Sequence, residues 1–535
     1  MNRRQIDRWM MEGAGAWQRG DSRGALRAAE RVLAAATDFA PALHLAGLAH
    51  AAVGAPARAQ PLLARAVTLM PDNADCLSAL GACYFDLGQM AAAVDCFRRV
   101  VRLRPSDTNA RMNLGLALER LGRHDEAART YMELAGAPVP HVDACARLGA
   151  LAEERNELEQ ADEWVARALA LEPGNVVANL TRAQLDARAD RYDAAARRLQ
   201  KLLEQPLSAT NEAIAAGRLG RAFDRLGEYA AAFAAVQRGN RALARSYGAA
   251  ADGDGPYSLA AIARLRAFFD SAEMPAGSAS TDTRTPVFLV GFPRSGTTLL
   301  DRMLAAHPAV AVLEEQETLA AIKRDFLMDE DGLARLWALP AEAMERYRDA
   351  YWRDVDARLP GAQKSTVVDK LPLNAIFTGL IHRVFPNAKF ILALRDPRDV
   401  CLSCFMQTFG GNEAMRHLLD LDTIGTYYAA VMDLVELYRE RLPLNLTAVR
   451  YEELVADPRG AIEPLLAFLD RPWNDAVLSY RDKLRGTRID TPSYHQVSRP
   501  LYGSAIGRWR HYREQLAPLL PRLQPFVERF GYEPD

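Results

Sequence analysis

The 535-residue sequence predicts two structural parts: an α-helical superhelix, then an α/β domain with a mostly parallel sheet and helices on both faces. The superhelix is predicted because small residues recur every 34 residues in the first half. The α/β domain is predicted because short apolar runs alternate with helical patterns in the second half. Polar and charged residues follow several of these runs, where the ends of parallel strands form a ligand-binding crevice.

Small residues mark each repeat of the first half. Glycine leads five units 34 residues apart, and the series continues with an alanine and, after a slip of three residues, another glycine: Gly13, Gly47, Gly81, Gly115, Gly149, Ala183 and Gly220. Alanine stands twelve residues after each position, where small side chains let paired helices approach closely. Gly, Asn or Asp stands seven residues after each, and these residues tolerate the positive φ of a helix end. Pro71, Pro105 and Pro173 stand where a second helix should end.

A helix–turn–helix unit with this period resembles the tetratricopeptide repeat. We expect seven units, residues 5–245, to stack into a right-handed superhelix with a concave face. The resemblance implies a surface that binds protein segments, and a purely structural or dimerising array is the alternative. Residues 246–285 are small and polar around a predicted helix at Ser258–Phe269, so we place a linker there and the second domain at 286–535.

The segment Pro286–Leu300, PVFLVGFPRSGTTLL, has the pattern of a phosphate-binding turn between a buried strand and a helix. Backbone N–H groups of such a turn and the positive end of the helix dipole converge on an anion. Gly291 and Gly296 have the spacing of a nucleoside-triphosphate P-loop, but Thr297 stands in place of its lysine. ATP or GTP hydrolysis is therefore poorly supported, and Arg294 supplies the positive charge instead.

The turn PRSGTT resembles the 5′-phosphosulfate-binding loop of sulfotransferases that use 3′-phosphoadenosine 5′-phosphosulfate (PAPS). The wider run RSGTTLLDRMLAAHP, followed by two glutamates, is similar to tyrosylprotein sulfotransferases and to bacterial repeat-containing sulfotransferases. The resemblance continues to the C-terminus through five motifs in the family's order. It implies that the turn binds the donor through Arg294, Ser295, Gly296, Thr297 and Thr298.

Glu314 and Glu315 follow a second short strand pattern, at the same crevice as the turn. A carboxylate there is placed to take a proton from an acceptor hydroxyl, although two adjacent acids are more often a solvated turn. The resemblance favours Glu315 as the general base, because the family has a Glu at the same offset from the loop arginine. Lys370, in VVDKLPLN, resembles the family's DK-x-P segment, which implies that Lys370 stabilises charge on the transferring sulfuryl group.

Arg395 and Ser403 follow another predicted strand, eight residues apart. The resemblance assigns this pair to the 3′-phosphate of PAPS, and an arginine fork with a serine hydroxyl is chemically suited to that anion. Cys401 and Cys404 form an isolated CxxC pair on the following helix, which we interpret as packing rather than as a zinc or redox site.

Three later residues match further cofactor contacts of the family: Tyr451, Ser493 and Arg508. Tyr451 stands at the exit of the last predicted strand. Ser493 and Arg508 stand in a run that resembles the loop closing over the cofactor. Arg508 replaces the lysine of the animal enzymes, which keeps the charge but alters the geometry.

Composition excludes several other classes of protein. The net charge is −2 with 25% charged residues, so we expect no nucleic-acid partner. The sequence has no apolar run long enough for a signal peptide or a membrane span. The six cysteines are too scattered for a disulfide scaffold, and the sequence has no metal-ligand cluster. We therefore expect a cytoplasmic protein that uses no metal, and the family resemblance implies PAPS as co-substrate.

The sequence thus predicts in-line transfer of a sulfuryl group from PAPS to an acceptor hydroxyl, with protein tyrosine as one candidate. Glu315 takes the acceptor proton, while Arg294, the turn amides and Lys370 stabilise negative charge. The repeats are expected to recruit the acceptor or a partner protein, and a homodimer is left open. Two alternatives also stay open: a P-loop-like nucleotide kinase or hydrolase, and a non-catalytic repeat scaffold with an inert nucleotide-binding domain.

Overall fold

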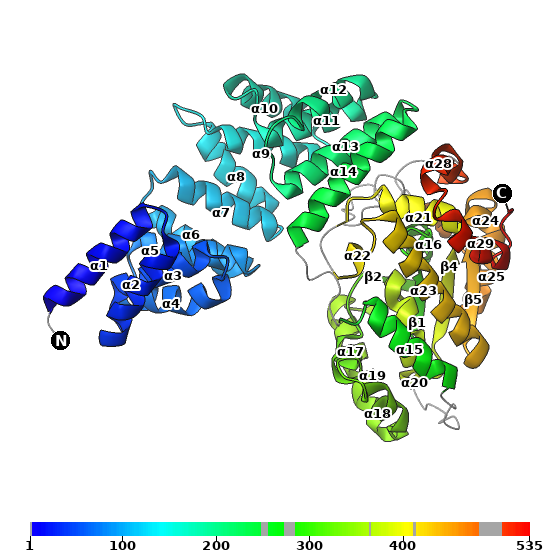
Figure 1. Cartoon of the computed structure of the whole chain (residues 1–535). Helices are drawn as coiled ribbons and strands as arrows, with labels where there is room; N and C mark the ends of the chain where they lie inside the picture. The colour runs from blue at the N-terminus through cyan, green and yellow to red at the C-terminus, as the bar shows by residue number, and fades with distance from the viewer. Residues whose placement is uncertain are drawn as a thin grey trace. The chain divides into compact units, whose positions relative to one another are not determined.

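A computed structural model describes the chain over residues 3–247, 255–271, 284–362, 365–409, 413–480 and 505–534 (Figure 1). The chain divides into two compact units, Met1–Leu202 and Leu203–Asp535. The first unit is built from consecutive helices: α1 (Arg3–Gln18), α2 (Ser22–Ala35), α3 (Ala40–Ala52), α4 (Pro56–Leu69), α5 (Ala74–Asp86), α6 (Met90–Leu103), α7 (Thr108–Arg120), α8 (His124–Ala135), α9 (Val142–Glu154), α10 (Leu158–Leu171), α11 (Val176–Arg188) and α12 (Tyr192–Leu202).

The small residues of each repeat have the two roles that their spacing predicts. All seven residues at the predicted helix ends have positive φ, from 56° at Asp190 to 79° at Gly122 and Gly227. The glycines at the repeat starts lie against the second helix of their own unit. A Cβ atom added to Gly115 would lie 2.3 Å from the buried ring of Tyr131, and one added to Gly149 would lie 2.6 Å from Val165. Glycine is therefore required there by close packing between paired helices.

The second unit contains a five-stranded sheet and the helices that cover it. Its elements, in chain order, are α13 (Ala209–Arg225), α14 (Tyr229–Tyr247), α15 (Leu259–Ser271), β1 (Val287–Gly291), α16 (Thr297–Ala305), β2 (Val310–Glu314), α17 (Ala320–Phe326), α18 (Gly332–Ala338), α19 (Ala341–Arg358), β3 (Thr366–Lys370), η3 (Pro372–Phe377), α20 (Thr378–Val384), β4 (Lys389–Leu394), α21 (Pro397–Phe405), α22 (Glu413–Arg416), α23 (Leu421–Arg441), β5 (Asn445–Arg450), α24 (Tyr451–Ala456), α25 (Pro458–Phe468), η4 (Asp475–Val477), η6 (Arg508–Tyr512), α28 (Arg513–Leu516) and α29 (Leu520–Arg529).

The strands lie in the order β2-β3-β1-β4-β5, and every pair among these five strands is parallel. Alternate residues of β1 enter different apolar clusters: Phe288 and Val290 belong to one, Val287 and Leu289 to the other. Helices therefore cover both faces of the sheet, as Figure 1 shows. The predicted fold class, helical repeats followed by an α/β domain with a parallel sheet, is confirmed.

The last repeat helices, α13 and α14, belong by packing to the second unit although their sequence belongs to the repeats. Val236 of α14 lies in the apolar cluster of the α/β domain, and the Phe233 ring stacks on Phe405 at 4.6 Å. Helix α15, which the sequence placed in a linker, buries Leu265 and Phe269 in the same cluster. The domain bounds 5–245, 246–285 and 286–535 stay a prediction, while the compact units divide after Leu202.

Within the described ranges, no helix combines the length and the apolar character that crossing a membrane requires.

Candidate functional site

The turn after β1 has a backbone that ordinary side chains rarely adopt. Arg294 has a φ of 72° and Gly296 a φ of 93°. A non-glycine residue in this region costs on the order of 1–3 kcal/mol and is found preferentially at functional sites. A Cβ atom on Gly296 would also lie 2.6 Å from the ring of Tyr451, so glycine is required by both backbone and space. The predicted strand–turn–helix is present, with Gly296 as the N-cap of α16.

Four of the predicted site residues meet at this turn from three different strand ends. The Arg294 Nε donates to Ser403 Oγ at 3.1 Å, and an Arg395 NH group donates to the Arg294 carbonyl oxygen at 3.2 Å. The guanidinium of Arg395 lies 4.8 Å from the ring centroid of Tyr451. The parallel sheet brings them together because each residue follows the carboxyl end of a strand or lies on the helix after it.

The two arginines concentrate positive charge at this turn. Arg395 is 8% exposed, and its Nε has no hydrogen-bond partner among the described residues. Burial lowers the pKa of Arg294, and the neighbouring Arg395 lowers it further. Two adjacent guanidinium groups, one of them buried, favour an anion between or beside them.

The chemistry at the other side of β1 centres on the ammonium group of Lys370. Strands β2 and β3 pair so that Glu314 faces Lys370, and the Glu315 amide donates to the Lys370 carbonyl oxygen at 2.7 Å. The Lys370 Nζ lies 2.6 Å from Glu315 Oε1, 3.1 Å from Asp301 Oδ2 and 3.5 Å from Glu314 Oε1. Glu314 also pairs with Arg302.

The Lys370 side chain is completely buried. Burial lowers its pKa, but Asp301, Glu315 and Glu314 outweigh that effect, and the net pKa is raised. Lys370 therefore carries its proton, and its charge holds the Glu315 carboxylate in place. Glu315 itself has a φ of 49°, another left-handed residue at this edge of the sheet.

Asp301 is a site residue that the sequence reasoning missed. Asp301 lies on α16 and is 1% exposed. Burial raises the pKa of its carboxyl to about 7, although the charge of Lys370 acts to lower it. A usable signal was present, because Asp301 is a lone acid in the apolar run TLLDRML and follows Thr297 by one helical turn. A carboxylate buried among apolar residues needs a cation as its partner, and at this end of the sheet that cation is Lys370.

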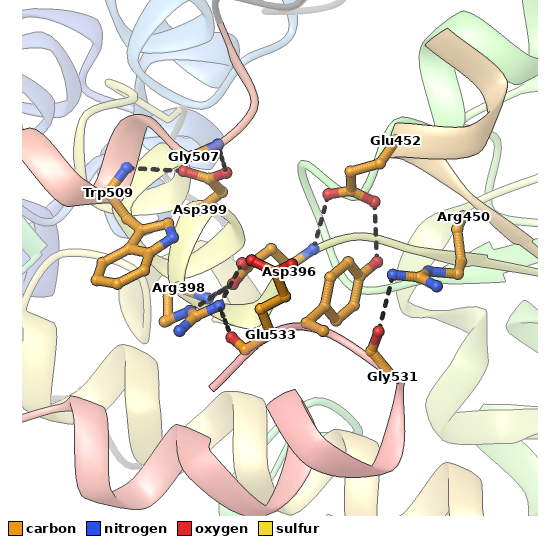
Figure 2. Close-up of polar contacts among 10 residues, drawn as sticks. Asp396, Arg398, Asp399, Arg450, Glu452, Gly507, Trp509, Gly531 and Glu533 are labelled. Atoms are coloured by element: carbon orange, nitrogen blue, oxygen red, sulfur yellow. Dashed lines mark hydrogen bonds and ion pairs between the residues drawn. The ribbon is translucent and has the colours of Figure 1, made fainter. Parts of the chain in front are cut away.

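The C-terminal segment, residues 505–534, is held against the start of α21 by buried polar contacts (Figure 2). The carboxylate of Asp399 accepts from the amides of Gly507, at 2.7 Å, and Trp509, at 2.8 Å. The Arg398 guanidinium lies over the Trp509 ring, with its Cζ 4.1 Å from the ring centroid. This part of the segment contains Arg508, so the contacts fix the backbone on both sides of a predicted cofactor residue.

A second set of contacts joins the chain end to β4 and β5. Arg398 pairs with Asp396 at 2.8 Å and donates to the Glu533 carbonyl oxygen at 2.9 Å. Glu452 accepts from the Asp396 amide at 3.1 Å and from the Tyr532 hydroxyl at 2.9 Å. Arg398 is therefore a structural residue, and its neighbours hold the two strand exits that present Arg395 and Tyr451.

The remaining predicted residues have mixed outcomes. Ser295, Thr297 and Thr298 are buried in the turn and in the first turn of α16. Arg508 pairs with Asp224 of α13, and Ser493 lies outside the described residues.

Both cysteines of the CxxC pair are buried and free. Burial raises the pKa of Cys401 well above its usual value and that of Cys404 to about 12. Neither thiol is poised to ionise, in agreement with a packing role. Among the described residues, no group of three or more His, Cys, Asp and Glu side chains is arranged to hold a metal ion.

Residues 286–475 match the model of the sulfotransferase family. This segment is therefore similar to that family. Residues 44–107 and 79–141 match the model of the tetratricopeptide repeat. The sulfotransferase match contains the turn after β1, Lys370 and the Arg395–Ser403 pair, and it ends before Arg508.

Sequence relatives are found among bacterial and animal proteins. An uncharacterized protein of Aquifex aeolicus is 31% identical over 253 residues, which make up 45% of this chain and 32% of that protein. Protein-tyrosine sulfotransferase 1 of Danio rerio is 28% identical over 275 residues, covering 46% of this chain and 72% of that protein. Protein-tyrosine sulfotransferase A of Caenorhabditis elegans is 28% identical over 262 residues, covering 46% and 67%.

The solved structure of a tetratricopeptide repeat protein from Parabacteroides merdae is similar over 44% of this chain and 92% of that chain, with 14% identity and a TM-score of 0.39.

Asp301 makes the stability of the α/β domain depend on pH. Its pKa rises on folding from 3.8 to about 7, so the folded state holds a proton that the unfolded state has released between these values. Stability therefore falls as pH rises through that window. We expect Asp301→Asn to remove about 2–3 kcal/mol of the loss between about pH 5 and pH 8. Urea unfolding at both pH values measures it.

Asp369, whose pKa burial also raises to about 7, is present in both proteins and cancels in the comparison. Equal pH dependence in the wild type and in Asp301→Asn would contradict the assignment.

Proposed function

We propose that this chain transfers a sulfuryl group from PAPS to an acceptor hydroxyl. The observation that carries the proposal is the convergence of Arg294, Arg395 and Ser403 on one turn, beside the Lys370–Glu315 pair. PAPS has two separate anionic groups, and the edge of the sheet offers donors for both. The 5′-phosphosulfate suits the turn amides and Arg294, and the 3′-phosphate suits Arg395 and Ser403.

Two features of the site support this fit. The Arg395 Nε is buried without a hydrogen-bond partner among the described residues, which is costly unless a ligand supplies an acceptor. The Tyr451 ring packs directly against Gly296, and an aromatic ring beside the turn is suited to contact a nucleotide. Thr297 occupies the place of the P-loop lysine, so a nucleoside-triphosphate kinase or hydrolase is the weaker alternative.

The proposed reaction is an in-line displacement. The acceptor oxygen forms a bond to sulfur as the sulfur–oxygen bond to the 5′-phosphate breaks, which leaves adenosine 3′,5′-bisphosphate. Glu315 takes the hydroxyl proton, and Arg294 with the turn amides stabilises charge on the leaving phosphate. Lys370 donates to Glu315 at 2.6 Å, so it keeps the base oriented, and we assign it the stabilisation of sulfuryl charge as well.

The acceptor and the setting are also part of the proposal. Because the relatives include protein-tyrosine sulfotransferases, we propose protein tyrosine as the acceptor and the repeats as the part that recruits the acceptor protein. We propose that the reaction takes place in the cytoplasm and needs no metal.

The 3′-phosphate should dominate nucleotide affinity. We expect adenosine 3′,5′-bisphosphate to bind at least about 100-fold more tightly than 5′-AMP, a difference of about 2.7 kcal/mol. Arg395→Ala should remove most of that difference, because it removes the buried guanidinium that faces the second anion. Titration calorimetry measures both affinities.

Arg439→Ala is the matched control, since Arg439 pairs with Glu436 of its own helix, α23. Equal affinities of the wild type for the two nucleotides would refute the assignment of the second phosphate site.

Glu315 and Glu314 should separate in kinetics. Glu315→Gln keeps the shape but cannot accept a proton, so kcat should fall by about 10²–10⁴ with little change in the KM for PAPS. Glu314→Gln should lower kcat less than about tenfold, because Glu314 pairs with Arg302. Steady-state kinetics with a tyrosine peptide or a phenol measure both.

The reverse result, with Glu314→Gln inactive and Glu315→Gln active, would move the base by one residue. His307 offers no substitute, because its Nδ1 accepts from the Ala309 amide and its Nε2 lies 3.0 Å from the Pro472 carbonyl oxygen.

A further inference from the structure

An acid of the last repeat helix pair, Asp224 of α13, contacts the C-terminal segment. Its Oδ1 accepts from the Tyr512 hydroxyl at 2.6 Å and forms an ion pair with the Arg508 guanidinium. Arg508 and Tyr512 are the two ends of the short helix η6. One carboxylate therefore holds both ends of the element that contains a predicted cofactor residue.

Aromatic packing supports this contact from α14. The Tyr229 ring stacks on His511 at 4.5 Å and meets Tyr512 edge-on at 5.3 Å. Tyr512 and Trp509 are buried, and Trp509 is fixed to Asp399 of α21 through its amide. The short helix η6 is therefore held by α13 and α14 as well as by α21.

The same helix pair also supports α21, the helix that contains Ser403 of the second phosphate site. The Asn240 side chain, 3% exposed, donates to the Phe405 carbonyl oxygen at 3.0 Å, and Phe233 stacks on the Phe405 ring. Phe405 follows Ser403 by two residues on α21. A Cβ atom on Gly217 of α13 would lie 2.5 Å from Thr408 Oγ1, so α13 also packs closely against the chain beyond α21.

We propose that Asp224 is a positioning residue for the nucleotide site, acting through Arg508 and Tyr512, and that the last repeat helices are part of the working sulfotransferase. The inference rests on the proposed function in one respect, that Arg508 binds the nucleotide. Asp224 pairs with one end of the Arg508 guanidinium, and the Arg508 side chain is 33% exposed. Further N–H groups of the guanidinium are therefore left for an anion. A long arginine side chain loses much conformational freedom when it is fixed, and the ion pair meets that cost before the nucleotide arrives.

The opposite role of Asp224 has a different signature. If Asp224 merely neutralised Arg508 and competed with a phosphate for it, removing the charge would tighten nucleotide binding. If the pair were an incidental surface contact, removing it would change neither binding nor the order of η6.

The test uses full-length Asp224→Asn, which keeps the side-chain volume and removes the charge. We expect the Kd for adenosine 3′,5′-bisphosphate and the KM for PAPS to rise about tenfold, with kcat at saturation within about twofold. Arg508→Gln should give the same loss, and the double variant should lose no more than either single variant. Asp433→Asn is the control, since its partners Arg266 and Arg529 lie outside the site.

A second readout needs no nucleotide. The amides of Gly507 and Trp509 are bonded to Asp399, so their hydrogen exchange reports the order of the segment. We expect exchange over residues 505–512 to quicken about tenfold in Asp224→Asn, less in Tyr512→Phe, and not at all in Asp433→Asn.

The outcomes separate the two proposals. Unchanged exchange, or tighter nucleotide binding in Asp224→Asn, overturns the role of Asp224 while PAPS dependence stands. Failure of the wild type to bind the bisphosphate overturns the proposed function, and the exchange data still decide whether Asp224 orders η6.

Discussion

The parallel register of the five-stranded sheet is the constraint on which the site depends. Because all the strands run in one direction, their carboxyl ends meet at one edge, with Glu314 opposite Lys370, Gly291 opposite Ala393 and Leu394 opposite Arg450. The residue that follows each strand therefore lies at this same edge of the sheet. Regular secondary structure does most of the positioning, and the irregular backbone is confined to the turns, at Arg294, Gly296 and Glu315.

Charge pairing gives this edge its two halves. On one side a buried ammonium is surrounded by three carboxylates, which keeps Lys370 protonated and fixes Glu315. On the other side two guanidinium groups, of which that of Arg395 is buried, have Tyr451 and Ser403 as neighbours. No carboxylate is paired with Arg395 in the described structure. In the first half, the charge of Lys370 is already balanced by carboxylates. The second half carries positive charge and is therefore suited to bind an anion. This asymmetry is the physical reason to propose a proton acceptor beside a nucleotide site.

Much of this arrangement was predictable from the sequence, because its determinants are local. The 34-residue spacing located the positive-φ residues of the repeats, and the strand–turn–helix pattern located the turn at Arg294. The role of α13 and α14 was not predictable, because composition marks a change at residue 246 while packing depends on distant partners such as Phe405. The Asp224–Arg508 pair joins residues far apart in sequence, and no spacing rule indicates it. The catalytic and nucleotide-binding roles of the site residues stay predictions.

The most direct measurement follows the sulfur atom. The full chain is incubated with sulfur-labelled PAPS and cell extract, and mass spectrometry identifies the labelled molecules. The account predicts label on the hydroxyl oxygen of an acceptor, with one adenosine 3′,5′-bisphosphate released for each group transferred. Label recovered only as unreacted PAPS or free sulfate, or Mg²⁺-dependent turnover of ATP by the same protein, would contradict the account.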